Sequence, residues 1–310
     1  MWRSGFLESV HRGSLVVLDA AGEVTFAAGA VERPTLPRSS NKPVQATALL
    51  AAGWAPRSAR ELAIGAGSHN GEDGHREVAA GMLAAVGLAP DDLGCPPALP
   101  QHIGTESEWI VAGRAPERLA MNCSGKHAAM LSACVAAGWP TSGYLERDHP
   151  LQQAIEARLA EAAGEPVTAV VVDGCGAPQH ALSVTGLARG VLSLVQAEKG
   201  TRERAVADGM RAEPWFVAGT GREDTELMQA VPGLLVKGGA DGVHVAAVPD
   251  RGAVAFKLDD GGDRGRTPAL AAGLLRLGLP DDVLARWLLT PVSGGDGVVG
   301  EVRAAPELGR

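Results

Sequence analysis

The segment Gly242–Leu258, with the sequence GVHVAAVPDRGAVAFKL, contains two short apolar runs separated by Asp250-Arg251. Short apolar runs that are rich in valine and bounded by turn residues predict the two strands of a hairpin. Near the other end of the chain, Ser14–Ala20 (SLVVLDA) and Glu23–Ala28 (EVTFAA) form a similar pair around a glycine-containing turn. We therefore expect a sheet built from a hairpin at each end of the chain.

The middle of the chain has the end signals of helices. Most of the candidate helices are followed by a glycine, which is typical of a helix C-terminus, and one has a proline near its start. They cover Pro43–Ala52, Asp73–Val86, Lys126–Ala137 and His149–Ala163, with a last one at Pro268–Leu277. A short buried strand is expected at Thr168–Asp173. Because strands and helices do not alternate, the pattern predicts an α+β fold, with a mainly antiparallel sheet flanked by helices and a helical insert.

The composition is that of a globular protein with an ordinary core. The 310 residues are 45% hydrophobic and have a formal net charge of −8, and we expect one domain over residues 1–310. The negative charge argues against a binder of nucleic-acid phosphates. No apolar run precedes Glu8, and none approaches the roughly 20 residues of a transmembrane helix, so we expect no signal peptide and no membrane partner.

The cysteine content points to a reducing compartment. Cys95, Cys123, Cys134 and Cys175 are few for a chain of this length and follow no secretory segment. They therefore predict free thiols rather than a disulfide framework, and we expect a cytoplasmic location.

The tetrapeptide Ser39-Ser40-Asn41-Lys42 is an S-x-x-K motif at the start of the first predicted helix. Residues at i and i+3 of a helix face the same side, so Lys42 is placed to take the proton of Ser39. The positive field at a helix N-terminus favours the resulting alkoxide. The simpler interpretation is that Ser39 caps the helix and Lys42 is solvated, because such short patterns arise often by chance.

Two further motifs strengthen the catalytic interpretation. Ser68–Asn70 (SHN) is an S-x-N in a glycine-rich loop, and Lys237–Gly239 (KGG) is a K-x-G that leads into the C-terminal strand pair. The order S-x-x-K, S-x-N, K-x-G is the signature set of serine acyl-transfer enzymes. Such chemistry needs a nucleophile with its base, a proton-relay hydroxyl with an amide, and a cation for the substrate carboxylate.

The remaining motifs are weaker. Cys123 precedes a predicted helix and Cys175 follows a predicted strand, so the two thiols could join a nitrogen or oxygen ligand around zinc. Neither cysteine belongs to a C-x-x-C motif, and buried structural cysteines are the commoner explanation. Of the histidines, His69 and His127 lie nearest the candidate chemistry. Gly219–Arg222 (GTGR) is too short a match to a phosphate loop, so nucleotide binding is not expected.

As a set, these segments resemble the asparaginase II family, the rhizobial-type (class 3) L-asparaginases. The resemblance extends from about residue 8 to residue 303 in the order of the family. Its blocks are Glu8–Gly13, Pro37–Gln45, Ser68–Glu72, Asn122–His127, Asp173–Pro178, Ala218–Arg222, Lys237–Val243 and Gly297–Arg303.

The resemblance implies hydrolysis of the side-chain amide of L-asparagine to L-aspartate and ammonia. It also implies a fold similar to serine β-lactamases and glutaminases, and a homodimer. Ser39 and Lys42 match the nucleophile pair of the family, and Ser68 matches its second serine. Lys237 matches the remote lysine, with Lys257 on the neighbouring strand as the second choice.

The resemblance also assigns a metal site and substrate contacts. Cys123, Lys126 and Cys175 match an unusual zinc site in which a lysine joins two cysteines, so zinc is the expected metal. The substrate-binding residues that we expect are Arg38, Asn70, His127 and Asp173.

The expected mechanism is acyl transfer. Lys42 deprotonates Ser39, which attacks the amide carbonyl, while Ser68 and Lys237 pass the proton to the departing ammonia. An alternative makes Ser68 the nucleophile, with Ser39 and Lys42 as the relay. A glutaminase, a β-lactamase-like serine hydrolase and a non-catalytic amino-acid or metal-binding relative remain as competing functions.

The sequence departs from the family pattern in three places. Gly238 stands where a hydroxyl residue is common, and Asp241 stands where glutamate is usual. The segment between Cys175 and Gly219 is short. These changes bear on substrate affinity and preference.

Overall fold

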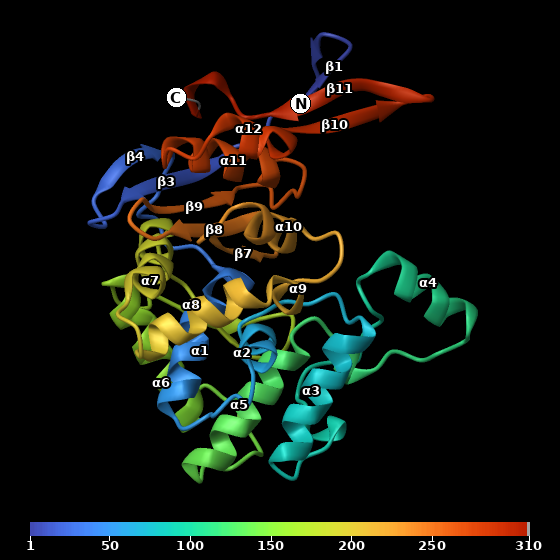
Figure 1. Ribbon diagram of the computed structural model, residues 1–310, viewed down its shortest axis with the longest axis vertical. Helices are drawn as coiled ribbons and strands as arrows, with labels where there is room; N and C mark the ends of the chain where they lie inside the picture. The colour runs from blue at the N-terminus through green and yellow to red at the C-terminus, as the bar shows by residue number, and fades with distance from the viewer. Residues whose placement is uncertain (309–310) are drawn as a thin grey trace.

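A computed structural model describes residues 1–308, and its centre is a five-stranded antiparallel sheet in the order β4-β3-β9-β8-β7 (Figure 1). Strand β3 pairs with β9 over its whole length. The two predicted hairpins, β3–β4 and β8–β9, therefore do meet in one sheet, and β7 adds an edge strand beside β8. The strands are β3 (Gly13–Asp19), β4 (Val24–Ala28), β7 (Leu235–Gly239), β8 (Val243–Val248) and β9 (Gly252–Leu258).

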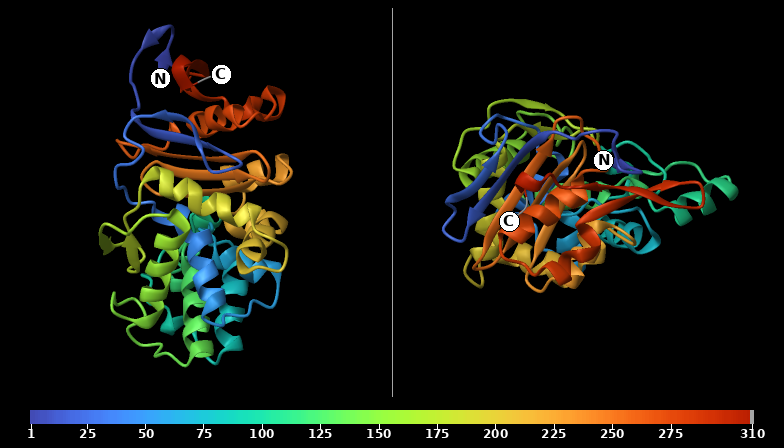
Figure 2. Two further views of the ribbon diagram at one scale, coloured as in Figure 1. Left: turned by 90° about the vertical axis from the view of Figure 1, so that its left-hand side faces the viewer. Right: turned by 90° about the horizontal axis from the view of Figure 1, so that it is seen from above.

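Helices cover both faces of this sheet. Helix α7 (Val184–Gln196) packs against β3, β8 and β9 on one face, and α11 (Arg266–Arg276) packs on the other (Figure 2). Every residue of β8 is buried, which explains why its sequence is apolar apart from His244 rather than alternating. The Oγ of Ser183 caps α7 by accepting a hydrogen bond from the Gly186 N–H at 2.8 Å.

A helical insert lies below the sheet in the view of Figure 1. Four of its helices confirm the predictions to within two residues: α1 (Lys42–Ala51), α3 (Asp73–Ala85), α5 (Ser124–Ala137) and α6 (Pro150–Ala163). The others are α2 (Ala59–Gly65), α4 (Ile103–Val111), α8 (Arg202–Ala212), α9 (Pro214–Val217) and α10 (Glu223–Ala230). The strand expected at Thr168–Asp173 is shorter, and the expectation that it is buried was wrong: β5 (Val170–Val172) pairs only with β6 (Pro178–His180), and its Val171 and Val172 are exposed. Helix α11 begins before its predicted start, because Gly265 is the N-cap and Pro268 lies inside the first turn.

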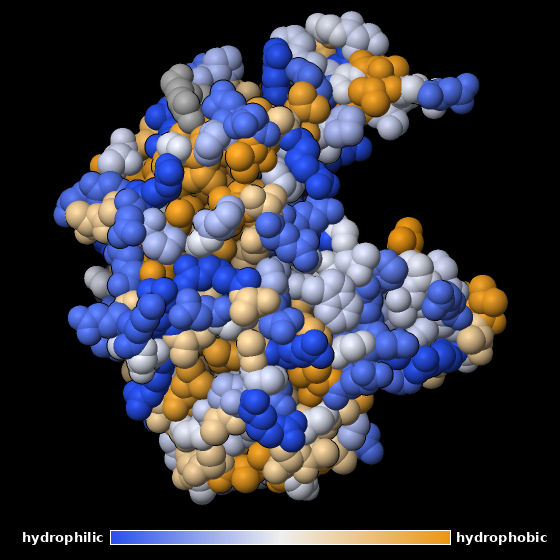
Figure 3. All heavy atoms as spheres, viewed as in Figure 1, coloured by the Kyte–Doolittle hydropathy of each residue, from blue (hydrophilic) through white to orange (hydrophobic). Residues whose placement is uncertain are grey.

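A second sheet, absent from the sequence prediction, joins the two ends of the chain in the order β10-β11-β1-β2. We call this sheet the arm. The molecular surface is hollowed between the arm and the projecting α4 (Figure 3). The arm contains β1 (Trp2–Arg3), β2 (Phe6–Leu7), β10 (Leu289–Gly294) and β11 (Gly297–Arg303), and α12 (Asp281–Leu284) precedes it. Within residues 1–308, each helix falls short of the length and apolar character that crossing a bilayer requires.

The edge strand β7 is held against the segment that carries the S-x-x-K motif. This segment is a 3-10 helix, η1 (Arg38–Asn41), that runs directly into α1. A Cβ atom on Gly239 would lie 2.8 Å from the carbonyl oxygen of Pro37, so the absence of a side chain there allows the close approach. The fold thus brings the K-x-G strand beside Ser39.

Candidate active site

A cleft of about 720 Å³ opens beside the end of β7. Its walls come from η1, from the loop after α2, from the loop before α10, and from β7 with the turn that follows it. Both candidate serines line it, together with Asn122, Arg222, Gly238 and Asp241. The cleft therefore unites the three motifs that are far apart in the sequence.

Ser39 lies in a constrained stretch of backbone. Arg38, directly before it, has φ +52°, a left-handed conformation that is uncommon for residues other than glycine. In the described part of the chain the Ser39 hydroxyl makes no hydrogen bond, so it is free toward the cleft. Its position at the start of the η1–α1 helical run places it near the positive end of the helix dipole.

Lys42 is buried and makes three hydrogen bonds. Its Nζ lies 2.7 Å from the carbonyl oxygen of Gly67, 2.8 Å from the Oγ of Ser68 and 3.0 Å from the Sγ of Cys123. These contacts hold the amine between the loop after α2 and the N-terminus of α5. The serine that contacts Lys42 is thus Ser68, whereas the S-x-x-K spacing had led us to expect Ser39.

The loop that carries Ser68 is fixed by backbone and histidine contacts. The Ser68 N–H donates to the carbonyl oxygen of Val217 at 2.7 Å. His69 Nδ1 accepts a hydrogen bond from the Gly71 N–H at 3.1 Å, so its Nε2–H donates to the Oγ of Ser124 at 3.0 Å. Burial, together with nearby His75 and Lys42, lowers the pKa of His69 well below its usual range. This neutral histidine holds the loop and does not face the cleft.

Asn70, which we expected to bind substrate, is buried and holds Arg222 in place. Its Nδ2 donates to the carbonyl oxygen of Thr220 at 3.0 Å, and its Oδ1 accepts from Arg222 Nη1 at 3.1 Å. The Arg222 guanidinium lines the cleft beside Ser68. Asn70 therefore orients Arg222, and Arg222 rather than Asn70 presents its side chain to the cleft.

Lys237 lies in β7 directly behind the cleft wall. Its side chain is 1% exposed, and its Nζ donates to the carbonyl oxygen of Gly238 at 2.6 Å and lies 3.6 Å from Asp224 Oδ2. Burial lowers the pKa of Lys237 to about 7. An amine with this pKa can exchange a proton near neutrality.

Lys257, the second choice for the remote lysine, lies elsewhere. Its Nζ donates to the carbonyl oxygens of Asp241 and Leu258, at 2.5 and 2.6 Å. It lines a separate cavity next to Gly13 and Gly29. This placement favours Lys237 for the role.

The two cysteines and the lysine of the expected metal site come together at the N-terminus of α5. Lys126 Nζ lies 3.2 Å from the Sγ of Cys175, and Asp173 Oδ2 lies 3.6 Å from the same sulfur. A hydrogen bond from the Cys175 thiol, together with Lys42 and Lys126, lowers the pKa of Cys123 well below its usual range. Two sulfurs with one nitrogen are donors that zinc accepts, and Cys123 has the thiolate form that binds it, so these residues fit the metal. Binding at the other two donors releases a proton from each, because the hydrogen bond with Cys123 raises the pKa of Cys175, and, although burial opposes it, the two sulfurs raise the pKa of Lys126.

Of the other residues that we expected to bind substrate, His127 lies outside the cleft, whereas Arg38 pairs with a residue that lines it. His127 is fully buried, its Nδ1 lies 2.6 Å from the hydroxyl of Tyr144, and it does not line the cleft. Burial lowers the pKa of His127 to about 4. Arg38 donates from Nε to Asp173 Oδ1 at 2.8 Å and also pairs with Asp241, which lines the cleft. Burial opposes the ionisation of Asp173, but Lys126 and Arg38 together lower its pKa.

The sequence model of the L-asparaginase II family matches residues 1–304. The chain belongs to the L-asparaginase II family. Family membership supports an amidohydrolase that acts on a small molecule. Among proteins of curated function, none matches the chain.

Several solved structures have a similar fold. They include a candidate β-lactamase from Bacteroides dorei DSM 17855, with 14% identity, a TM-score of 0.46 and coverage of 86% of this chain and 93% of that one. Mglu in its tris and glutamate form has 14% identity, a TM-score of 0.44 and coverage of 86% and 57%. A β-lactamase from Mycobacterium bovis has 15% identity, a TM-score of 0.40 and coverage of 89% and 94%. These likenesses are too distant to bear on activity.

Sequence reasoning missed two residues of this site, Arg222 and Asp224. Both lie at or just after the block Ala218–Arg222, which we rejected as a phosphate loop and used for the family resemblance without giving Arg222 a role. The sequence signal for them is Arg222 followed directly by two acidic residues, Glu223 and Asp224, at the start of α10.

Proposed function

We propose that the protein hydrolyses the side-chain amide of L-asparagine to L-aspartate and ammonia, with Ser39 as the nucleophile. The observation that carries this proposal is the 2.8 Å hydrogen bond between Ser68 Oγ and the buried Lys42 Nζ, at the wall of a cleft that Ser39 also lines. Hydroxyl and amine groups in contact are what acyl transfer needs to move a proton.

In the proposed reaction Ser39 Oγ attacks the amide carbon. Lys42 takes part as a neutral amine, so the Ser39 proton passes through the hydroxyl of Ser68 to its Nζ and then returns, by way of Ser68 and Lys237, to the amide nitrogen. The carbon–nitrogen bond breaks and ammonia leaves, so that Ser39 holds an aspartyl ester. Water then attacks the ester, the proton path operates again, and L-aspartate is released with Ser39 regenerated.

The cleft offers groups for both charged ends of an amino acid. The guanidinium of Arg222, which Asn70 orients, is placed for the α-carboxylate. The carboxylate of Asp241, which also lines the cleft, is placed for the α-ammonium. A free amino acid with both charges is thus the substrate class that this lining fits.

Zinc, when bound, would be held by Cys123, Lys126 and Cys175. A zinc ion there would supply a positive charge that orients nearby groups and polarises a substrate oxygen. Without the metal, the Cys123 sulfur helps to keep Lys42 in place, because it is one of the three groups that Lys42 Nζ contacts.

Replacing either cysteine with alanine is expected to remove the metal. After incubation with zinc and gel filtration, the unmodified protein should keep about one zinc per chain, because the site has one set of donors. Cys123→Ala and Cys175→Ala should each keep almost none. Elemental analysis by mass spectrometry measures this, and Cys134→Ala, which changes a buried cysteine in α5 away from the site, should keep the metal. Equal zinc in all four proteins would contradict the site.

The proposed activity predicts ammonia release from L-asparagine. A coupled assay should show release from L-asparagine and much less from L-glutamine, whose side chain is one methylene longer. One methylene changes transition-state binding by about 1–3 kcal/mol, or roughly 10- to 200-fold in rate. Faster release from L-glutamine would make the protein a glutaminase, and turnover of a chromogenic β-lactam alone would make it a β-lactamase. No turnover of any of the three, with zinc supplied, would reject the proposal.

A further inference from the structure

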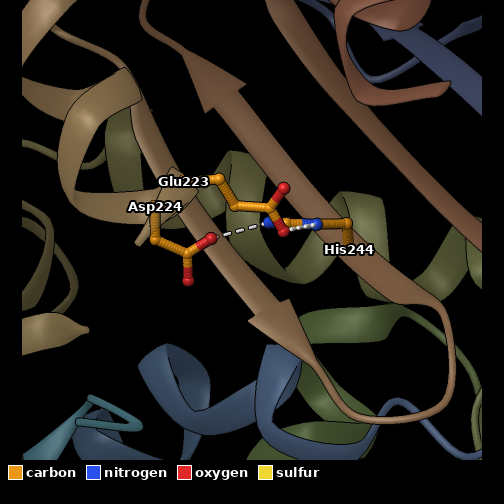
Figure 4. A group of neighbouring side chains, drawn as sticks. All are labelled: Glu223, Asp224 and His244. Carbon is orange, nitrogen blue, oxygen red and sulfur yellow. Dashed lines mark hydrogen bonds and ion pairs between the residues drawn. The ribbon is translucent and has the colours of Figure 1, made fainter. Parts of the chain in front are cut away.

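Glu223, Asp224 and His244 form a group of neighbouring ionisable side chains (Figure 4), and Asp224 is the member that contacts Lys237. Asp224, in the first turn of α10, accepts a hydrogen bond from His244 Nε2 at 2.7 Å through Oδ1. Its other oxygen, Oδ2, accepts from the Gly238 N–H at 2.9 Å and lies 3.6 Å from Lys237 Nζ. Asp224 therefore connects the amine and the backbone of β7 to the neighbouring strand.

Asp224, His244 and Lys237 are almost completely buried. Asp224 is 2% exposed, and His244 and Lys237 are 0% and 1% exposed. A carboxylate removed from water is stable only when it is paired and fully hydrogen-bonded. Burial raises the pKa of Asp224, but His244 and Lys237 together lower it well below its usual range. Asp224 is thus a fixed negative charge inside the protein.

The neighbouring Glu223 has other partners and so does not complete a cation site. Its carboxylate pairs with Arg266 and accepts a hydrogen bond from the hydroxyl of Thr267 at 2.5 Å. The ring of His244 lies between the two carboxylates, with Nδ1 3.5 Å from Glu223 Oε1. With Arg266 on Glu223 and His244 on Asp224, each carboxylate already has a partner, and only Asp224 contacts Lys237.

Gly238 explains how the histidine fits. Gly238 and His244 are directly opposite each other on β7 and β8. A Cβ atom on Gly238 would lie 3.2 Å from two atoms of the His244 ring and 3.3 Å from the Arg266 guanidinium. The glycine, one of the departures from the family pattern, leaves room for the imidazole that holds Asp224.

We propose that Asp224 is a positioning residue that holds Lys237 at the back of the cleft and keeps a negative charge beside its amine, and that His244 fixes Asp224 in this orientation. The inference rests on the proposed function for the part that Lys237 plays in the reaction. The contacts themselves do not depend on that function.

The pKa of Lys237 depends on charged groups from several elements of the fold. Removing the negative charge of Asp224 leaves a buried amine beside mostly positive groups, so the neutral amine is favoured and the pKa of Lys237 falls below about 7. Apart from burial, the groups that act on its pKa are Asp224 and Cys123, which raise it, and Lys42 and Arg222, which lower it.

Lysine NMR tests the inference directly. The chain has only five lysines, so protein labelled with ¹³C at lysine Cε gives five signals. The signal that is lost in Lys237→Arg is that of Lys237. In the unmodified protein this signal should titrate near pH 7. In Asp224→Asn its midpoint should fall by about 1 to 3 pH units, the usual effect of one adjacent charge. The limb of the kcat/KM pH profile that Lys237 sets should move the same way.

Two histidine variants and one control complete the experiment. His244→Gln keeps an N–H donor for Asp224 and should leave the midpoint close to that of the unmodified protein, whereas His244→Leu should lower it. The comparison of the two histidine variants tests the positioning role even if Asp224→Asn does not fold. Glu165→Gln, which changes the carboxylate that accepts hydrogen bonds from Ser183 far from the cleft, should lower stability without moving the midpoint.

The outcomes separate the two proposals. A Lys237 midpoint that is the same in the unmodified protein, Asp224→Asn and His244→Leu would overturn the positioning role, whatever the activity. A shifted midpoint in a protein that releases no ammonia from L-asparagine would reject the proposed function and leave the positioning of Lys237 intact.

Discussion

Replacing Ser39 with alanine is expected to lower kcat for L-asparagine by about 10⁶-fold, as the loss of the nucleophile does in other serine hydrolases. The Ser39 hydroxyl makes no hydrogen bond within the described residues, so its removal should leave the melting temperature unchanged. KM should change little, because the hydroxyl contributes to the transition state rather than to substrate binding. Steady-state ammonia release and a thermal melt measure these effects.

A second hydroxyl and a trapping experiment give the control. Ser132→Ala removes one buried serine hydroxyl, which donates to the carbonyl oxygen of Ala128 at 2.8 Å in α5, and should keep full activity. Acid quenching during turnover followed by peptide mass spectrometry should find the aspartyl ester on Ser39. An ester on Ser68, with activity retained in Ser39→Ala, would transfer the nucleophile role to Ser68.

Local patterns in the sequence were sufficient to predict four of the five strands of the central sheet, all but the edge strand β7. The β8–β9 hairpin is an almost continuous apolar run, and its partner β3 has the same character, because helices cover both faces of these strands. The arm escaped prediction because β1 and β2 are two residues long and β10 contains a proline. Such strands are specified by pairing between the two ends of the chain, which local patterns do not report.

The site was predictable as a set of residues but not as a set of contacts. The motifs and the family resemblance predicted Ser39, Lys42, Ser68 and Lys237 as a group, and the two serines do line one cleft, with both lysines buried. The partner of Lys42 depends on how the loop after α2 returns to α1, and that loop is fixed by long-range bonds such as Ser68 N–H to Val217. His127 carried a functional signal in the sequence, yet the packing of α5 turns it toward Tyr144.

The proton path between Ser68 and Lys42 predicts that their substitutions are not additive. Ser68→Ala and Lys42→Met should each lower kcat by about 10² to 10⁴-fold, the usual contribution of general acid–base groups. Each substitution breaks the same 2.8 Å hydrogen bond, so the double variant should be no slower than the slower single one. Steady-state kinetics of the four proteins give the coupling energy directly.

Stability separates the catalytic effect of Lys42 from a structural one. Lys42→Met also removes the partner of the Cys123 sulfur, so we expect a lower melting temperature than in Ser68→Ala. Lys199→Met, at an exposed lysine, is the control and should be normal in both activity and melting. If the losses in Ser68→Ala and Lys42→Met multiply in the double variant, the two groups act independently, and Lys42 then takes the proton of Ser39 by a route that does not include Ser68.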